Sequence, residues 1–156
     1  MEVIEEEGCL NESQCAKLRK FLHYAISLSL TQWQQQYVQL FDFSTHSNLY
    51  LFDHVYGDSR ERGQAMVDLT EMYAKSGFTP CSNELPDYLP LFLEYLSLLT
   101  KAEESEKLLQ EVSSILGNMK QALDKKETAY AFLLDILQTL STPLENQLDK
   151  KKGVSV

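Results

Sequence analysis

The sequence is poor in the residues that make tight turns and disulfides. It has six glycines and four prolines among 156 residues, fewer than a sandwich or barrel with many turns would use. Its three cysteines, Cys9, Cys15 and Cys81, are odd in number and never spaced as CxxC. This pattern argues against a disulfide framework or a zinc knuckle and suits a reducing compartment. The composition therefore favours an all-α protein.

Positive charge is also scarce. Lys and Arg total 14 against 23 Asp and Glu, which gives a formal net charge of -9. A polyanion such as DNA or RNA would be repelled, because nucleic-acid affinity comes mainly from Lys and Arg side chains that neutralise phosphates. We therefore expect no nucleic-acid partner. The acidity itself leaves two interpretations open, which are solubility and the attraction of a basic peptide.

Long apolar segments are missing as well. The most apolar run, residues 89–99, contains Glu94 and is too short to span a bilayer. Residues 1–7 carry four glutamates, the wrong charge for a signal peptide. We expect a cytoplasmic protein that does not insert into a membrane.

Apolar side chains recur at helical spacing along most of the chain, and the length fits one domain. We predict a bundle of about six helices over 1–143, followed by a flexible tail over 144–156. The first expected helix is 11–28 with Asn11 as N-cap, and the second runs from a Ser29/Gln32 capping box to about 42. The third runs from an Asp58/Glu61 capping box to Gly77, and the fourth is capped by Asp87 and ends near 99. The last two are 108–123 and 128–140. Residues 48–56 are ambiguous, and we favour helix because both neighbours are helical.

The usual catalytic signatures are absent from the sequence. It has no glycine-rich phosphate loop, no G-x-S-x-G, no H-E-x-x-H and no Glu-x-x-His pair. His54 lies close to Asp53 and Asp58, but Gly57 interrupts the helix between them. Partly exposed polar residues at a helix junction are therefore favoured over a metal site. We predict no enzyme activity, no metal and no cofactor; a metal- or nucleotide-dependent enzyme and a generic helical adaptor are the rival classes.

Two charged features each have two interpretations that the sequence alone leaves open. Arg60 and Arg62 lie at a helix start, where cations oppose the macrodipole. They either form salt bridges within the protein or face a partner. The corner at residues 84–90 has two prolines four apart and two carboxylates around the first proline. Either its aspartate only caps a helix, or the rigid corner offers fixed carboxylates and aromatic rings to a basic, partly apolar peptide.

Three segments resemble one known family. They are 37–42 (YVQLFD), 47–69 (SNLYLFDHVYGDSRERGQAMVDL) and 84–95 (ELPDYLPLFLEY). They look like the NarJ-type nitrate reductase assembly chaperones, also called nitrate reductase delta subunits, which belong with the TorD/DmsD redox-enzyme maturation proteins. The resemblance covers roughly 33–99 well and extends more weakly to about 140.

The resemblance implies an all-helical, NarJ/TorD/DmsD-like chaperone that needs no bound cofactor. Such proteins bind the N-terminal segment of the molybdenum-containing catalytic subunit of nitrate reductase in the cytoplasm. They hold it back from its membrane anchor until the molybdenum cofactor and iron–sulfur clusters are inserted. The family's E-P/L-P-D-H-type corner falls on Glu84, Pro86, Asp87 and Tyr88. Because Tyr88 stands where histidine is common, no role that needs an imidazole is expected there.

The physical pattern and the resemblance together predict a peptide-binding groove. We expect an amphipathic peptide helix to lie against six apolar or aromatic residues: Tyr37, Phe41, Leu51, Phe52, Tyr88 and Tyr95. Its basic residues would meet carboxylates, and the polar and proline residues of the predicted site are Asp53, His54, Glu84, Pro86, Asp87 and Glu94.

The resemblance begins partway into the family pattern, and the chain stops soon after the last expected helix. The family usually has a further N-terminal helix and a longer C-terminal tail. We therefore expect an apolar groove that is left uncovered, and a homodimer would be one way to cover it.

Overall fold

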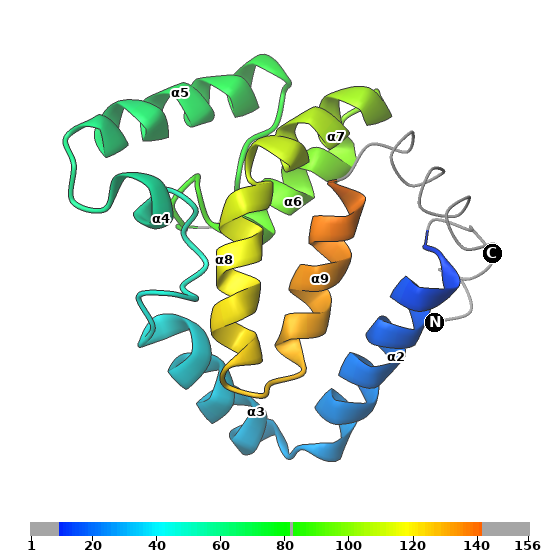
Figure 1. Ribbon diagram of the computed structural model, residues 1–156. Helices are drawn as coiled ribbons and strands as arrows, with labels where there is room; N and C mark the ends of the chain where they lie inside the picture. The colour runs from blue at the N-terminus through cyan, green and yellow to red at the C-terminus, as the bar shows by residue number, and fades with distance from the viewer. Residues whose placement is uncertain (1–9, 82, 142–156) are drawn as a thin grey trace, which may run out of the picture. The chain divides into compact units, whose positions relative to one another are not determined.

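The computed structural model describes residues 10–81 and 83–141. In this part of the chain the backbone forms eight α-helices and one π-helical segment (Figure 1). Strand-like pairing there is limited to one antiparallel bridge, between Tyr50 and Tyr88. The predicted all-α class is confirmed. The predicted tail over 144–156 lies outside the described residues. No helix in the described ranges combines the length and the apolar character that crossing a membrane requires.

Contacts divide the described residues into two compact units. The first unit contains residues 10–47 and 116–139, and the second contains residues 48–115 together with 140 and 141. The helical domain over 1–143 stays a prediction, and each unit is described below on its own.

The first unit begins with two helices that the sequence predicted by their caps. Helix α2, Glu12–Ser27, starts at Asn11, whose Oδ1 accepts a hydrogen bond from the Gln14 N–H at 3.0 Å. Helix α3, Leu30–Tyr37, starts at a capping box between Ser29 and Gln32. Each box satisfies N–H groups that have no partner inside a helix, which is worth about 1 kcal/mol. Both predicted caps are confirmed.

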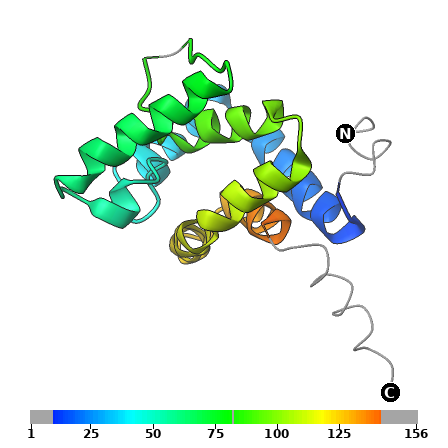
Figure 2. The same ribbon diagram turned by 90° about the horizontal axis from the view of Figure 1, so that it is seen from above.

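Aromatic packing forms the centre of the first unit. Helix α3 continues into a π-helical segment, Val38–Asp42, which buries Phe41. The Phe41 and Tyr130 rings meet edge to face, with their centroids 5.0 Å apart. Tyr130 begins helix α9, Tyr130–Leu140. Helix α8, Ser113–Asp124, runs beside α9 in both views (Figures 1 and 2). Its three fully buried side chains are Leu116, Met119 and Leu123, each of which contributes about 1.5–3 kcal/mol by leaving water.

The second unit contains four helices around a second apolar core. They are α4, Asp53–Tyr56; α5, Glu61–Lys75; α6, Leu89–Leu98; and α7, Ala102–Glu111. Helices α5 and α6 touch through Tyr73 and Tyr95, whose ring centroids lie 4.6 Å apart. Gly77 ends α5 with φ of 74°, the left-handed conformation that glycine adopts without a steric cost. The predicted stop at Gly77 is confirmed.

Several predicted element boundaries were wrong. Residues 48–56 are not one helix, because the backbone around Tyr50 is extended and only the single turn α4 follows. The Asp58/Glu61 capping box does not form; Arg60 is the N-cap, and the Ser59 Oγ accepts the Glu61 N–H instead at 3.3 Å. Residues 102–124 form two helices separated at Val112, followed by two serines, which are weak formers of helix interiors.

Candidate functional site

The corner at residues 84–90 is fixed by pairing with the segment at 49–51. The Leu51 N–H donates to the Asp87 carbonyl at 3.0 Å, and the Leu89 N–H donates to the Leu49 carbonyl at 2.7 Å. The Tyr50 and Tyr88 rings, on the two paired residues, lie 5.5 Å apart. Two of the three segments that carry the family resemblance are therefore joined by backbone hydrogen bonds within the second unit.

Asp87 is buried at the centre of this corner. Its side chain has no exposed surface, and its Oδ2 accepts the Phe52 N–H at 2.9 Å. Burial raises the pKa of the Asp87 carboxyl above its usual range, although the Phe52 N–H and the Arg62 guanidinium both oppose the rise. The prediction that Asp87 caps α6 was wrong: Tyr88 is the N-cap, because the carboxylate is used on Phe52 instead.

Two tyrosines hold the corner from either side. The Tyr73 hydroxyl of α5 donates to the Pro86 carbonyl at 2.7 Å. The Tyr50 hydroxyl donates to Glu84 Oε2 at 2.9 Å on the surface. This bond to a carboxylate raises the pKa of Tyr50 to about 12. Glu84 itself is exposed.

Asp53 and His54, two further polar residues of the predicted site, also have partners in the second unit. Arg62 forms a 2.6 Å ion pair with Asp53, which favours the salt-bridge interpretation for that arginine. The His54 Nε2–H donates to the Asn48 carbonyl at 2.9 Å. Within residues 10–81 and 83–141, no group of three His, Cys, Asp or Glu side chains could hold a metal ion.

An apolar hollow of about 250 Å³ opens beside the corner. Leu51 and Phe52, both predicted site residues, line it together with residues of the surrounding helices. The other lining residues are Tyr56, Ala65, Asp68, Leu69, Met72, Phe92, Leu108, Glu111 and Val112. Asp68 and Glu111 are exposed, so the hollow combines apolar walls with carboxylates at its edge.

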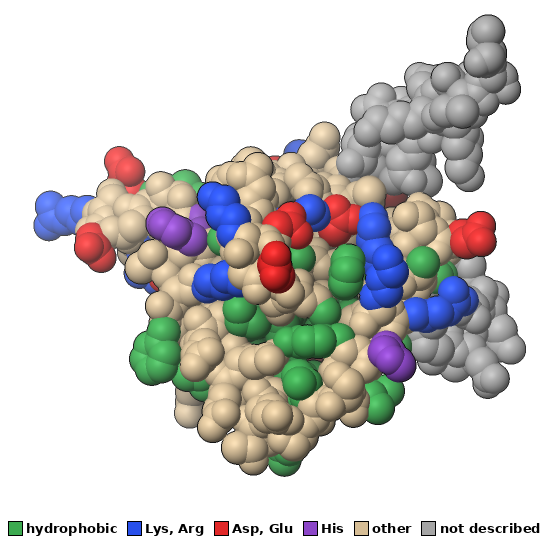
Figure 3. All heavy atoms as spheres, turned by 60° about the horizontal axis from the view of Figure 1, so that its bottom comes forward, with side chains coloured by type: hydrophobic (Ala, Val, Ile, Leu, Met, Phe, Trp, Pro, Cys, Tyr) green, Lys and Arg blue, Asp and Glu red, His purple; other side chains and the backbone are tan. Residues whose placement is uncertain are grey.

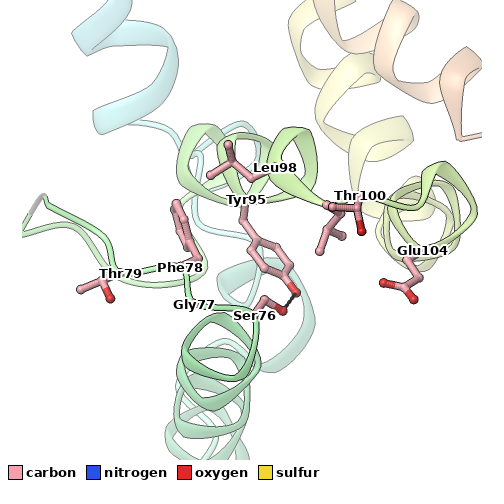
Figure 4. A pocket seen from close by; sticks show the side chains of 9 residues that line it. Ser76, Gly77, Phe78, Thr79, Tyr95, Leu98, Thr100 and Glu104 are labelled. Atoms are coloured by element: carbon pink, nitrogen blue, oxygen red, sulfur yellow. Dashed lines mark hydrogen bonds between the residues drawn. The ribbon is translucent and has the colours of Figure 1, made fainter.

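A second hollow, of about 600 Å³, lies at the end of the same helices (Figure 4). Ser76 follows α5, Tyr95 belongs to α6, and Glu104 belongs to α7. The Tyr95 hydroxyl lies 3.1 Å from the Ser76 Oγ, and Glu104 lies on the other side of the hollow in Figure 4. Phe78, Thr79, Leu98 and Thr100 also contribute side chains. This hollow is more polar than the first because hydroxyl groups line it.

The two hollows follow one another along α5, α6 and α7. On α5 the lining residues advance from Ala65 to Met72 and then to Ser76, and on α7 they advance from Glu111 to Glu104. We call this pair of hollows the α5–α7 groove. From Ala65 to Ser76 a helix rises about 16 Å, which matches about three turns of a bound helix.

The structure brings together most of the predicted site, but not all of it. Leu51, Phe52 and Tyr95 line the α5–α7 groove, and Glu94 is exposed on α6. Four of the remaining predicted residues lie in the corner, namely Glu84, Pro86, Asp87 and Tyr88. Asp53 and His54 belong to α4. Tyr37 and Phe41 belong to the first unit, where their rings lie 5.0 Å apart. The role of these residues in peptide binding stays a prediction.

Sequence reasoning missed the two carboxylates of the apolar hollow. Asp68 lies four residues before Met72, and Glu111 lies three residues after Leu108. Residues three or four apart are neighbours on a helix surface, so helical spacing alone places each carboxylate beside an apolar groove residue. That spacing was the available signal.

The sequence itself has identifiable relatives. Residues 8–150 match the family described as "Nitrate reductase delta subunit". The chain belongs to the nitrate reductase delta subunit family. The family resemblance predicted from residues 37–95 is confirmed.

Three delta subunit relatives have informative names. The "Nitrate reductase molybdenum cofactor assembly chaperone NarJ" of Escherichia coli K12 is 40% identical over 90% of this chain. The "Probable nitrate reductase molybdenum cofactor assembly chaperone NarW" of the same strain is 39% identical over 88% of it. The corresponding probable NarJ of Bacillus subtilis 168 is 34% identical over 86% of the chain and 72% of its own length. The chain spans 59% of the length of each of the two E. coli proteins.

Proposed function

We propose that this chain is an assembly chaperone for nitrate reductase and has no catalytic activity of its own. Its family membership supports the proposal, as do the names of relatives that match about nine-tenths of the chain. Its client would be the molybdenum-containing catalytic subunit, held in the cytoplasm until its cofactors are inserted and before it attaches to the membrane. The observation that carries the proposal is the α5–α7 groove, which offers apolar walls and carboxylates to a client segment.

The proposed ligand is the N-terminal segment of that catalytic subunit, bound as an amphipathic helix. Its apolar face would lie against Phe52, Met72 and Leu108 in the apolar hollow. Its basic residues would meet Asp68 and Glu111 at the edge, because a charge-assisted hydrogen bond to a carboxylate is stronger than a neutral one. A helix laid into a groove in this way is a common mode of peptide recognition.

The corner at residues 84–90 supports the groove in this proposal. Asp87 is fully buried and bonded to Phe52, a groove residue. It would therefore position Phe52, while the exposed Glu84 supplies further negative charge to the peptide. Asp53 is half-buried and paired with Arg62, so it would contribute less. Tyr88 and Pro86 would contribute to the proposed site by fixing the backbone conformation of the corner.

Calorimetric titration with a synthetic peptide of the client's N-terminal segment tests the site. In the double variant Asp68→Asn/Glu111→Gln we expect at least tenfold weaker binding, about 1.4 kcal/mol. Glu103→Gln/Glu106→Gln is the matched control: it removes two exposed carboxylates from α7, the helix of Glu111, outside the residues that line the groove. The control should bind as the unaltered chain does. Equal loss in both variants would show that only overall charge matters, and no binding by the unaltered chain would contradict the proposed ligand.

A second experiment tests the client itself. The chain, tagged and expressed in cells respiring on nitrate, should co-purify with the catalytic subunit. Cells without the chain should accumulate catalytic subunit that lacks molybdenum cofactor. Capture of many unrelated proteins at similar yield would favour a generic helical adaptor instead.

A further inference from the structure

The surface of the first unit has an exposed apolar face that the proposed peptide site does not use. Ile26 is 82% exposed, Leu30 is 69% exposed and Phe43 is 83% exposed. Trp33 and Val38, between them in sequence, are also exposed large apolar side chains. We call these five residues the α2–α3 face. Single exposed apolar residues are ordinary, but a group of them usually marks an interaction site.

The same stretch of chain carries one charged side chain, that of Asp42 next to Phe43. Residues 24–41 contain no Asp, Glu, Lys, Arg or His, in a chain where 24% of residues are charged. Their exposed polar groups include the amides of Gln34, Gln35 and Gln39. Figure 3 shows hydrophobic side chains set in uncharged surface in the lower half of the view, with the acidic and basic side chains gathered above them.

The exposed apolar side chains and the scarcity of charge favour a second copy of this chain as the partner. A twofold interface brings a surface against itself, so the surface must be complementary to itself. An amide both donates and accepts hydrogen bonds and meets this condition, whereas a carboxylate only accepts. Two copies of a chain with net charge -9 repel each other. They can approach at the lowest electrostatic cost through a face where Asp42 is the one charged residue. A basic client peptide would find no carboxylate within residues 24–41.

We propose that the α2–α3 face is the interface through which two copies of this chain form a dimer. The sites are separate by residue: the face lies within 26–43, and the residues that line the α5–α7 groove lie within 51–112. The dimer therefore does not depend on the proposed chaperone function.

Sedimentation velocity of the full chain over about 1–100 µM tests this interface. We expect the mass to rise from one copy to two, and the dimer to strengthen with added salt, because salt screens the mutual repulsion. Leu30→Glu should raise the dissociation constant at least tenfold, a change of about 1.4 kcal/mol. Glu is tolerated at this first position of α3, since an anion is favourable at a helix N-terminus.

Two controls make the test specific. Val67→Glu adds the same charge at an exposed apolar residue of α5 in the second unit and should leave the dimer intact. Mixing Leu30→Glu with Leu30→Lys chains should restore association. Trp33, the one tryptophan of the sequence, should shift its emission to shorter wavelength as the dimer forms. A full chain that stays monomeric over the whole range, or a dimer that Val67→Glu weakens as much as Leu30→Glu does, overturns the proposal.

Discussion

At the scale of one residue, Asp87 fixes the corner by a hydrogen bond, and the burial of its carboxylate lowers the stability of the fold. Its carboxylate is fully buried. One oxygen accepts the Phe52 N–H, and no hydrogen-bond partner for the other was found among the described residues. Taking a carboxylate out of water is costly unless charges and donors compensate. Arg62 supplies part of that compensation through its charge. The residue fixes the backbone of Phe52 at some expense in stability.

Asp87 should make the free energy of unfolding depend on pH in an unusual direction. Burial raises its pKa in the folded chain, so the folded state binds this proton more tightly than the unfolded state does. The stabilisation that this bound proton contributes is then fully present below the pKa of Asp87 in the unfolded chain, about 3.9. It is lost as the pH rises through the pKa of Asp87 in the folded chain. Urea unfolding of the unaltered chain and of Asp87→Asn at several pH values measures this. The free energy of unfolding of the unaltered chain minus that of Asp87→Asn should fall with rising pH. A difference that stays constant or rises would contradict the raised pKa of Asp87.

The two tyrosines that hold the corner should differ in their effect on stability. Tyr73→Phe leaves the Pro86 carbonyl without its donor in a partly buried position, which should cost about 1–2 kcal/mol. Tyr50→Phe removes a hydrogen bond between exposed groups and should cost less than about 1 kcal/mol. Urea unfolding followed by circular dichroism compares them. Equal losses would mean that the Tyr73 bond does not support the corner.

At the scale of elements, the two glycines of α5 and its C-terminal end have different effects on the stability of the helix. Gly77 adopts φ of 74° after the helix ends, a conformation that is strained for a residue with a side chain. Gly63 lies inside α5, where a Cβ would meet no atom within 4 Å. The first glycine ends the helix, and the second only weakens it.

This contrast gives a matched pair of variants. Gly77→Ala should lower the free energy of unfolding by about 1 kcal/mol, because alanine must adopt the left-handed conformation. Gly63→Ala should raise it by about 0.5–1 kcal/mol, since alanine is the better helix former. Denaturant unfolding under identical conditions tests both. The same sign of change in the two variants would be inconsistent with this account of α5.

The elements also show what the sequence could predict and why. The caps of α2 and α3 depend on residues three apart, so Asn11 and Ser29 were recognised from sequence alone. The bond from Phe52 to Asp87 joins residues 35 apart, and no local pattern predicts it. That bond removed Asp87 from its expected place as a cap. The family resemblance pointed to the corner. Helical spacing could place Asp68 and Glu111 each beside an apolar residue, but only the structure shows that both line one hollow.

At the scale of the whole molecule, charge is distributed according to the proposed partners. The chain has net charge -9, and carboxylates edge the α5–α7 groove. The α2–α3 face has almost no formal charge, because Asp42 is the one Asp, Glu, Lys, Arg or His residue within 24–43. A basic peptide and a second copy of the chain would thus be directed to different surfaces.

The acidic surface should speed the arrival of a basic client peptide. Attraction between opposite charges raises association rates, and salt weakens it, since the Debye length falls from about 10 Å at 0.1 M to about 3 Å at 1 M. In stopped-flow measurements the association rate should fall at least tenfold over that range. Dissociation should change much less. An association rate that is insensitive to salt would mean that charge does not guide the encounter.

Hydrogen–deuterium exchange with and without the client's N-terminal peptide tests the central claim most directly. If the peptide helix lies in the α5–α7 groove, amides of residues 65–76 and 104–112 should exchange more slowly in its presence. Amides of α2 should be unaffected by the peptide. Protection confined to the first unit, or no protection at a saturating peptide concentration, would contradict the account.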